Sequence, residues 1–400
     1  MKFSVPHNWQ SDLLPRMNTA GVEQVYAKLA RDFVGGGRAS YMLPHVTKSK
    51  AAKCISEARQ RGISFNYLLN SNCLGNREWT AKGQRSLVAL LDWLIDIGVD
   101  SVTVSIPYLL ELIKRRYPKL KVGVSTQAGV DTIKRAKYWE GLGADRITLA
   151  EISVNRNFPL LRQIRSAVKC ELQLIANLDC LSSCPFWAYH AALNSHGSQD
   201  NHSSGGFLID YCSIACNYIR LKDPVEFIRA GWIRPEDVHY YEDIGIDSIK
   251  LVNRTFTTEA LLLIINAYIK GHYDGNLLDL FPRTSKTKNI ILQKPNILHK
   301  FRYFFHPFRV NLFRLFEARK LLGDMKVYID NRSLDGFITH FLDKSCDLQS
   351  CDECKYCNRV AEKSVNIAPD WQEKAVSNYR KYLDSLVGGK MFKYSVNLFK

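Results

Sequence analysis

The sequence has no long apolar run, no excess of acidic residues and no standard hydrolase motif. Its longest apolar stretch, residues 260–269, contains Asn266 and is too short to cross a bilayer, which takes about 20 apolar residues. The first ten residues lack the apolar core of a signal peptide. Neither H-E-x-x-H nor G-x-S-x-G occurs. We therefore expect a cytoplasmic protein without a transmembrane segment. The absence of both motifs gives no support for a standard zinc or serine hydrolase.

Basic residues are in clear excess: 55 Lys and Arg stand against 39 Asp and Glu, a net charge of +16. Hydrophobic residues make up 46% of the 400, enough for a substantial core, which excludes wholesale disorder. Residues 285–320 alone carry nine Lys or Arg, seven aromatics and one acid, Glu317. This pattern suits phosphate contacts with base stacking on RNA, an anionic membrane surface, or an amphipathic helix packed on the rest of the chain. The three interpretations stay open.

Eight of the eleven cysteines are clustered, which indicates metal ligands because disulfides are rare in a cytoplasmic protein. Thiolates are soft ligands that suit tetrahedral zinc or an iron–sulfur cluster. Two C-x3-C pairs 27 residues apart favour a cluster, whereas a C-x4-C-x2-C-x2-C quartet suits a second cluster or zinc. The first group is Cys180, Cys184, Cys212 and Cys216, and the second is Cys346, Cys351, Cys354 and Cys357.

Short β-type runs alternate with amphipathic stretches up to about residue 280, which predicts repeated βα units with a parallel sheet. Eight strands favour a closed TIM-like (β/α)8 barrel, with an open doubly wound sheet as the alternative. We expect the barrel in residues 1–284, a basic-aromatic linker or helix in 285–320 and a cysteine-rich extension in 321–400. The expected strands are residues 2–5, 39–43, 64–70, 101–105, 121–126, 146–150, 171–177 and 248–252.

Several segments resemble the collagenase-like peptidase family U32. Val124-Ser-Thr-Gln-Ala128 and Gly143-Ala-Asp-Arg-Ile-Thr-Leu-Ala-Glu151 are similar to that family's core motifs. The resemblance continues through the first cysteine group to the stretch from Tyr241 to Arg254 and covers residues 60–270. Lys250-Leu-Val-Asn-Arg254 departs from the family's K-I-E-G-R by lacking the Glu, and Cys180 and Cys184 stand closer together than the family's first two cysteines.

The resemblance implies a barrel that holds a 4Fe-4S cluster through Cys180, Cys184, Cys212 and Cys216. It also implies oxygen-independent hydroxylation, which some members perform on tRNA, ribosomal RNA or the ubiquinone precursor ring, with prephenate as one hydroxyl source. We expect a redox enzyme acting on a small molecule, RNA or peptide, assisted by an electron donor or a paired homologous subunit. A peptidase or an RNA-binding protein is the alternative.

The polar residues that follow the strands are the predicted site, because the carboxyl ends of barrel strands meet at one mouth. Lys250 and Arg254 would hold a carboxylate, and Glu151 and His190 would move protons. We assign Glu151, His190, Lys250 and Arg254 to catalysis, and Gln127 and Asn177 to substrate or cofactor binding.

Overall fold

Eight short parallel strands pair in sequence order, and the last pairs with the first, so the sheet closes into a barrel. Phe3 of β1 lies opposite Ile249 of β8 at the closure. The structure is a computed structural model that describes residues 1–200, 202–203, 205–206, 208–282, 291, 311–344, 346 and 351–390. The barrel strands are β1 (Lys2–Pro6), β2 (Val22–Ala27), β3 (Ser64–Leu69), β4 (Ser101–Val104), β5 (Lys121–Val124), β6 (Arg146–Thr148), β7 (Glu171–Ile175) and β8 (Ser248–Lys250).

The prediction of a closed eight-stranded barrel is confirmed, but the second strand was placed wrongly. Residues 39–43 were expected to form it, and the chain instead uses Val22–Ala27. Residues 40–42 form a 3-10 turn in the connection after β2, where Ser40 donates its backbone N–H to the Gly197 carbonyl, 2.9 Å away. Tertiary contacts with a distant helix therefore decide the conformation of this segment, despite its apolar, β-like composition.

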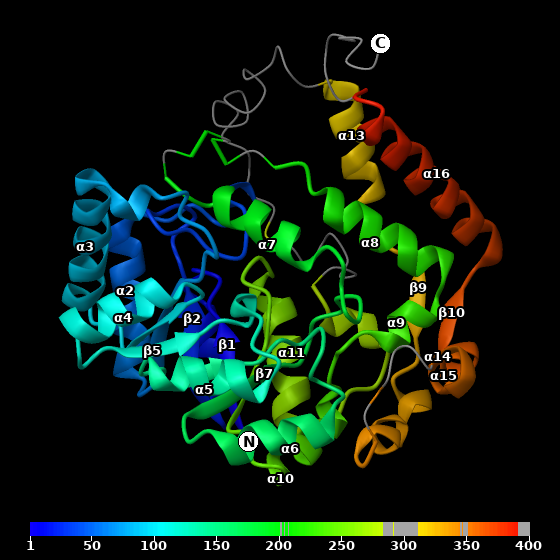
Figure 1. Cartoon of the computed structure of the whole chain (residues 1–400). Helices are drawn as coiled ribbons and strands as arrows, with labels where there is room; N and C mark the ends of the chain where they lie inside the picture. The colour runs from blue at the N-terminus through cyan, green and yellow to red at the C-terminus, as the bar shows by residue number, and fades with distance from the viewer. Residues whose placement is uncertain are drawn as a thin grey trace.

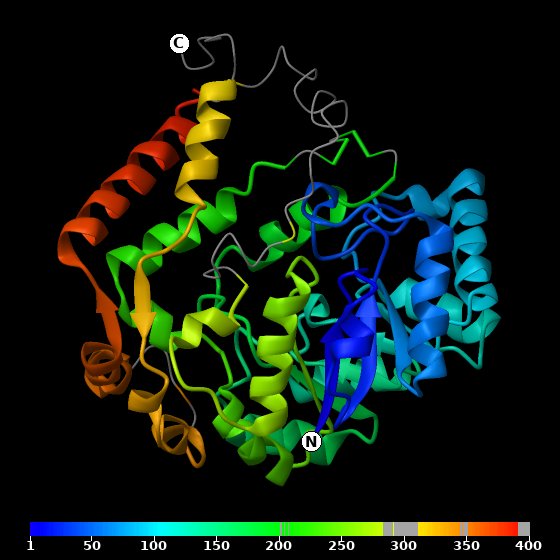
Figure 2. The same ribbon diagram turned by 180° about the vertical axis from the view of Figure 1, so that it is seen from behind.

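Helices surround the barrel and connect its strands (Figures 1 and 2). Gly62, Gly98, Gly143 and Gly245, expected after helices, all have positive φ, which a glycine adopts without steric cost. The helices are α1 (Leu13–Arg16), α2 (Lys48–Gln60), α3 (Ala81–Asp96), α4 (Pro107–Arg116), α5 (Ile133–Gly141), α6 (Phe158–Ala167), α7 (Trp187–His196), α8 (Tyr211–Lys222), α9 (Val225–Arg229), α10 (Val238–Asp243), α11 (Thr258–Lys270), α13 (Leu312–Leu321), α14 (Cys351–Cys354), α15 (Tyr356–Ser364) and α16 (Pro369–Val387).

Polar side chains with matched hydrogen bonds fill part of the barrel interior. Gln24 donates to Ser101 Oγ at 3.0 Å, and Asn66 donates to the same oxygen at 2.8 Å. Thr103 Oγ1 in turn donates to Asn66 Oδ1 at 2.8 Å. Because buried polar groups are costly only when unpaired, this network lets the barrel carry polar residues up to its mouth.

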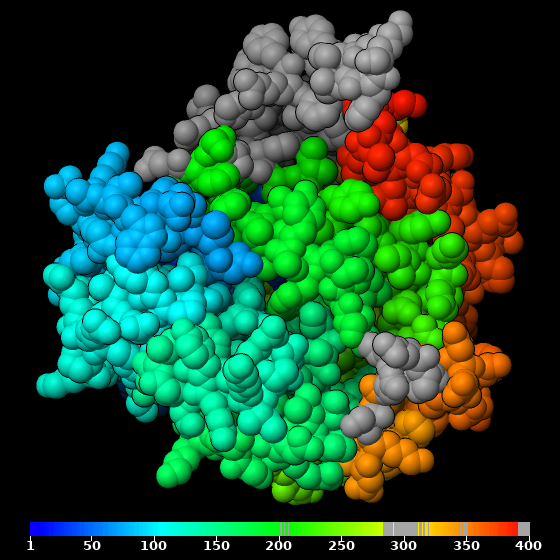
Figure 3. All heavy atoms as spheres, viewed as in Figure 1, coloured from blue at the N-terminus to red at the C-terminus, as the bar shows by residue number. Residues whose placement is uncertain are grey.

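The C-terminal segment packs against one side of the barrel (Figures 1 and 3). Its strands β9 (Val327–Ile329) and β10 (Val365–Ile367) pair antiparallel, and α16 runs along α8. Arg234 fastens the segment to the barrel, because it binds Asp237 at 2.9 and 3.0 Å and Asp335 at 3.0 Å. Within the described ranges no helix is long and apolar enough to cross a membrane.

Most of the basic-aromatic stretch 285–320, including Lys286, Lys288, Lys294, Lys300, Arg302 and Arg309, lies outside the described residues. The backbone of residues 312–321 forms α13. Binding of RNA or membrane by this stretch, and the predicted boundaries at 284 and 320, therefore remain predictions.

Candidate functional site

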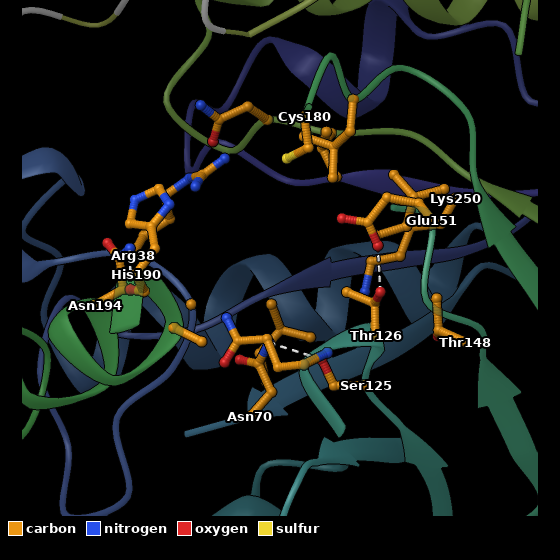
Figure 4. Close-up of a pocket in the computed structure, with 18 of the residues that line it drawn as sticks. Arg38, Asn70, Ser125, Thr126, Thr148, Glu151, Cys180, His190, Asn194 and Lys250 are labelled. Carbon is orange, nitrogen blue, oxygen red and sulfur yellow. Dashed lines mark hydrogen bonds between the residues drawn. The ribbon is translucent and has the colours of Figure 1, made fainter. Parts of the chain in front are cut away.

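A cavity of about 120 Å³ opens at the carboxyl ends of the strands, where the predicted residues converge (Figure 4). Its walls come from the segments that follow strands β2, β3, β5, β6, β7 and β8, together with α7. The polar and thiol residues in the wall are Tyr26, Arg38, Asn70, Ser125, Thr126, Gln127, Thr148, Glu151, Cys180, His190, Asn194, Lys250, Asn253 and Arg254.

Two buried cations dominate the electrostatics of this cavity. Lys250 ends β8 and places its Nζ 4.3 Å from the centroid of the Tyr26 ring. Burial, followed by repulsion from Arg254, lowers the pKa of Lys250 from 10.5 to about 7. Burial also lowers the pKa of Arg254 to about 10. Lys250 can therefore gain or lose a proton near neutral pH, while Arg254 stays charged.

Arg254 also has an unused donor. Its Nη1 is buried and has no hydrogen-bond partner among the residues that the structure describes. A buried donor left unsatisfied costs about 1–3 kcal/mol, and more when the group is charged. An anionic group bound beside Arg254 and Lys250 would offset this cost, so the cavity is suited to a carboxylate or another small anion.

Glu151 lies next to Lys250, on the segment after β6. It is almost fully buried, and its Oε2 accepts a hydrogen bond from the Thr126 hydroxyl. Figure 4 shows the Glu151 and Lys250 side chains next to each other, and the carboxylate of Glu151 acts to raise the pKa of Lys250. Glu151 and Lys250 can thus each hold a proton at the same place in the cavity.

His190 of α7 faces the cavity from the other side, next to Arg38 (Figure 4). Its Nε2 is 3.3 Å from Asp210 Oδ2. Burial raises the pKa of Asp210, but hydrogen bonds from His190 and Ser213 outweigh burial and hold that pKa well below its usual value. The ionised carboxylate orients the imidazole, which makes His190 a second candidate for proton transfer.

A triple-glycine loop after β2 brings backbone into contact with the site's amide side chains. A Cβ on Gly36 would lie 2.7 Å from Asn70 Oδ1, and one on Gly37 would lie 2.3 Å from Gln127 Nε2. Asn70 Oδ1 and Gln127 Oε1 are buried without a hydrogen-bond partner among the described residues. The lack of a Cβ on these glycines allows the close approach, and the two amide oxygens, which have no partner among the described residues, are available to a donor on a ligand.

A buried ion pair holds this loop in place. Lys28 Nζ is 2.9 Å from Asp32 Oδ2, and both side chains are almost inaccessible to solvent. Asp32 also accepts a hydrogen bond from the Gly35 N–H at 2.6 Å and from the Tyr67 hydroxyl at 2.9 Å. The carboxylate is thus fully bonded, which fixes the start of the glycine run.

Five of the six residues predicted for catalysis or ligand binding line the cavity: Gln127, Glu151, His190, Lys250 and Arg254. Asn177 does not. Its amide donates to the Val252 and Leu280 carbonyls and accepts from the Val252 N–H, so it links two loops behind the site. Sequence reasoning missed Tyr26 and Arg38, because both depend on the true position of β2. A glycine triplet directly before Arg38 was the available signal.

The first cysteine group lies in the connection between β7 and β8. Cys180 lines the cavity, while Cys212 and Cys216 are buried one turn apart on α8 and so share a face. Cys184 is half-buried. Across the ranges given above, no three Cys, His, Asp or Glu side chains are arranged to hold a metal ion. The ligand role of this group therefore remains a prediction.

The second cysteine group lies at the C-terminal segment, beside α9. Cys346, Cys351, Cys354 and Cys357 line one cavity of about 220 Å³ together with Arg229 and His340. Burial raises the pKa of the Cys357 thiol, and Arg156 acts in the opposite direction. The structure thus brings the four predicted thiols to one cavity, although four residues between Cys346 and Cys351 lie outside its description.

The closed parallel barrel, with a buried acid and buried cations at the carboxyl ends of its strands, gives the protein the TIM-barrel fold and the usual position of a TIM-barrel active site. The sequence profile of peptidase family U32 matches residues 18–182. "Uncharacterized protease MJ1657" of Methanocaldococcus jannaschii is 32% identical over 336 residues, which cover 84% of this chain and 87% of the relative. The chain therefore belongs to peptidase family U32.

Two further proteins are similar over a smaller part of the chain. "tRNA hydroxylation protein P1" of Bacillus subtilis is 22% identical over 213 residues, which cover 50% of this chain and 46% of that protein. The solved structure of the U32 peptidase Mk0906 is 24% identical, covers 63% of this chain and 93% of its own, and superposes with a TM-score of 0.47.

Proposed function

We propose that this family U32 protein is an iron–sulfur redox enzyme that hydroxylates a small molecule, RNA or peptide without molecular oxygen. One observation carries the proposal: Cys180, from the predicted ligand group, lines the same cavity as Lys250, Glu151 and Arg254. A soft ligand, buried cations and a proton-transfer group thus face one space. The Bacillus subtilis relative named for tRNA hydroxylation supports this class of reaction.

The donor set suits an iron–sulfur cluster in kind. Cys180, Cys184, Cys212 and Cys216 supply four thiols from one strand-to-strand connection, three of them buried. Holding a cluster would require the loop after β7 and helix α8 to bring these thiols together. When bound, the group would supply one-electron chemistry next to the cavity.

The chain's own side chains would bind the substrate and move its protons. Arg254, with its free Nη1, and Lys250 would hold a carboxylate of the substrate or of the hydroxyl donor. The oxygens of Asn70 and Gln127 would accept hydrogen bonds and orient the bound molecule. Glu151 would take or give a proton at the reacting carbon or oxygen, because it is buried beside Lys250.

The test is anaerobic purification and reconstitution, with iron, sulfide and zinc counted per chain. The loaded protein is then incubated with bulk tRNA, ribosomal RNA or small aromatic acids, together with a reductant and a carboxylate hydroxyl donor. Mass spectrometry detects a gain of one oxygen atom. We expect Glu151→Gln to lose at least about 100-fold in rate, the usual contribution of a proton-transfer group. Glu111→Gln, on an exposed face of α4, is the matched control.

Peptide hydrolysis is the second candidate, because the 32% identical archaeal relative is named a protease. His190, which is paired with Asp210, lines the cavity together with Cys180 and would be the general base. The same preparations, metal-loaded and metal-free, are incubated with a peptide library. Peptide cleavage by the metal-free protein that is lost in His190→Gln would replace the redox proposal. Zinc as the sole bound metal would also overturn the redox proposal.

A further inference from the structure

The C-terminal cysteine quartet shares its surroundings with an unusual arginine. Arg156 follows β6 and is 7% exposed. Its Cζ lies 4.3 Å from the centroid of the Trp232 ring and 4.7 Å from that of the Phe337 ring. Its Nη1 donates to the Ile228 carbonyl. Its Nε and Nη2 are buried and have no hydrogen-bond partner within the described part of the chain.

This guanidinium faces thiols. Arg156 and Arg229 line a cavity of about 110 Å³ together with Cys346, Cys351 and Cys357. It adjoins the 220 Å³ cavity, because Arg229 and the same three cysteines line both. A buried cation without a paired anion is strongly unfavourable, so the position of Arg156 calls for negative charge at the quartet.

We propose that Cys346, Cys351, Cys354 and Cys357 hold an iron–sulfur cluster, with Arg156 as its buried counter-charge and Arg229 as a second one. Four thiolates around iron and sulfide carry net negative charge, which would pair with both guanidinium groups. The site is separate from the one at the barrel mouth and does not depend on the proposed reaction.

The size of the cavity favours a cluster over a single zinc ion. Zinc would hold four sulfurs at about 2.3 Å, whereas the cavity that these thiols line has a volume of about 220 Å³, which leaves room for a multi-atom cluster. One water molecule needs only roughly 10–15 Å³ of such space.

The placement links this site to the barrel mouth. Glu151 lines both the 120 Å³ cavity at the barrel mouth and the 110 Å³ cavity beside Arg156. Ser182 and Ser183, which lie between Cys180 and Cys184 in sequence, line the latter cavity as well. The loop that carries Cys180 and Cys184 thus contributes to the same small cavity as Cys346, Cys351 and Cys357, although the two segments are some 170 residues apart in the sequence.

The first experiment separates the two sites by metal content. The full chain is reconstituted anaerobically with iron and sulfide, as wild type, Cys354→Ala and Cys180→Ala. Cys354 is exposed, so its replacement should not impair folding. We expect Cys354→Ala to lose the iron and sulfide bound at the C-terminal quartet. Cys180→Ala should keep that iron and sulfide. Loss of iron only in Cys180→Ala, or zinc alone at the quartet, would overturn this inference. Iron that survives in Cys180→Ala but not in Cys354→Ala would leave it standing even if the proposed function fails.

The second experiment tests the counter-charge. In the Cys180→Ala background, a redox titration followed by electron paramagnetic resonance measures the potential of the remaining cluster. We expect Arg156→Gln to shift the potential downward, because a nearby positive charge favours the more negative, reduced form. Arg156→Lys, which keeps the positive charge, should bring the potential most of the way back to the wild-type value. Arg332→Gln, at a 70% exposed position of the C-terminal segment, should leave the potential unchanged. Equal potentials in Arg156→Gln and wild type would overturn the role of Arg156.

Discussion

Replacing Lys250 by methionine should change how the stability of the protein depends on pH. The Lys250 side chain is 8% exposed, and its pKa is lowered from 10.5 to about 7, mainly by burial. Between these two values the unfolded chain holds this proton and the folded chain does not. The free energy of unfolding of the wild type therefore rises with pH across this window.

The magnitude follows from the size of the pKa difference. Each pH unit between about 7 and 10.5 adds about 1.4 kcal/mol, so the full contribution of Lys250 approaches about 5 kcal/mol. Below pH 7 both states hold the proton, and the cost of burying the ammonium is fully present. Lys250→Met lacks this dependence, so its advantage over the wild type should be largest near pH 7 and shrink as the pH rises.

Urea unfolding followed by circular dichroism at pH 7, 8, 9 and 10 measures this effect, as the difference between the two free energies of unfolding. Other titrating groups contribute to both proteins and cancel in the difference. Lys2→Met, at a 59% exposed position, is the control and should follow the wild type. Parallel curves for the wild type and Lys250→Met would refute the claim that Lys250 is buried at a site that disfavours its charge.

Two further predictions concern the glycine loop at the cavity. Gly35→Ala would place a Cβ 2.7 Å from the Ser195 carbonyl oxygen at a backbone φ of +80°, and should lower the free energy of unfolding by about 1–3 kcal/mol. Gly141→Ala, with no atom within 4 Å, should be neutral or slightly stabilising, and equal effects of the two changes in urea unfolding would contradict the packing argument. Lys28→Met should lower the free energy of unfolding by about 3–5 kcal/mol, because it leaves the Asp32 carboxylate buried without its cation. The double variant Lys28→Met/Asp32→Asn should lose less free energy of unfolding than the sum of the two single variants. Strict additivity in this double-mutant cycle would show that the pair is not coupled.

The sequence predicted the barrel because the pattern of its βα units is local. A β-branched run, a helix and a glycine with positive φ recur along the chain, and each depends on neighbouring residues only. The same logic placed Glu151, Lys250 and Arg254 in one site, since the carboxyl ends of parallel strands meet at one mouth. Where the local pattern was ambiguous the prediction failed: residues 39–43 have β-like composition, but their contact with Gly197 gives a 3-10 turn.

Long-range contacts decided what the local pattern could not. Arg38 lines the cavity directly after Gly36 and Gly37, which closely approach Asn70 and Gln127. The glycine triplet is visible in the sequence, but the sequence does not say which side chains it contacts. Asn177 follows a strand like the other site residues, yet loop carbonyls take up its amide. The same residue type in the same local position can thus be a ligand-binding group or a structural one, depending on which acceptors the fold brings near it.

By itself, the sequence favoured the barrel, carried the resemblance to the family, and indicated five of the six assigned residues and the grouping of the cysteines, because βα repeats, motifs and cysteine spacing can all be read along the chain. Only the tertiary structure decided that Lys250 is buried enough to titrate near neutral pH, and that Arg156 lies unpaired beside the C-terminal thiols. The physical reason is that desolvation and charge pairing depend on every group that surrounds a side chain, and those groups come from segments far apart in the sequence.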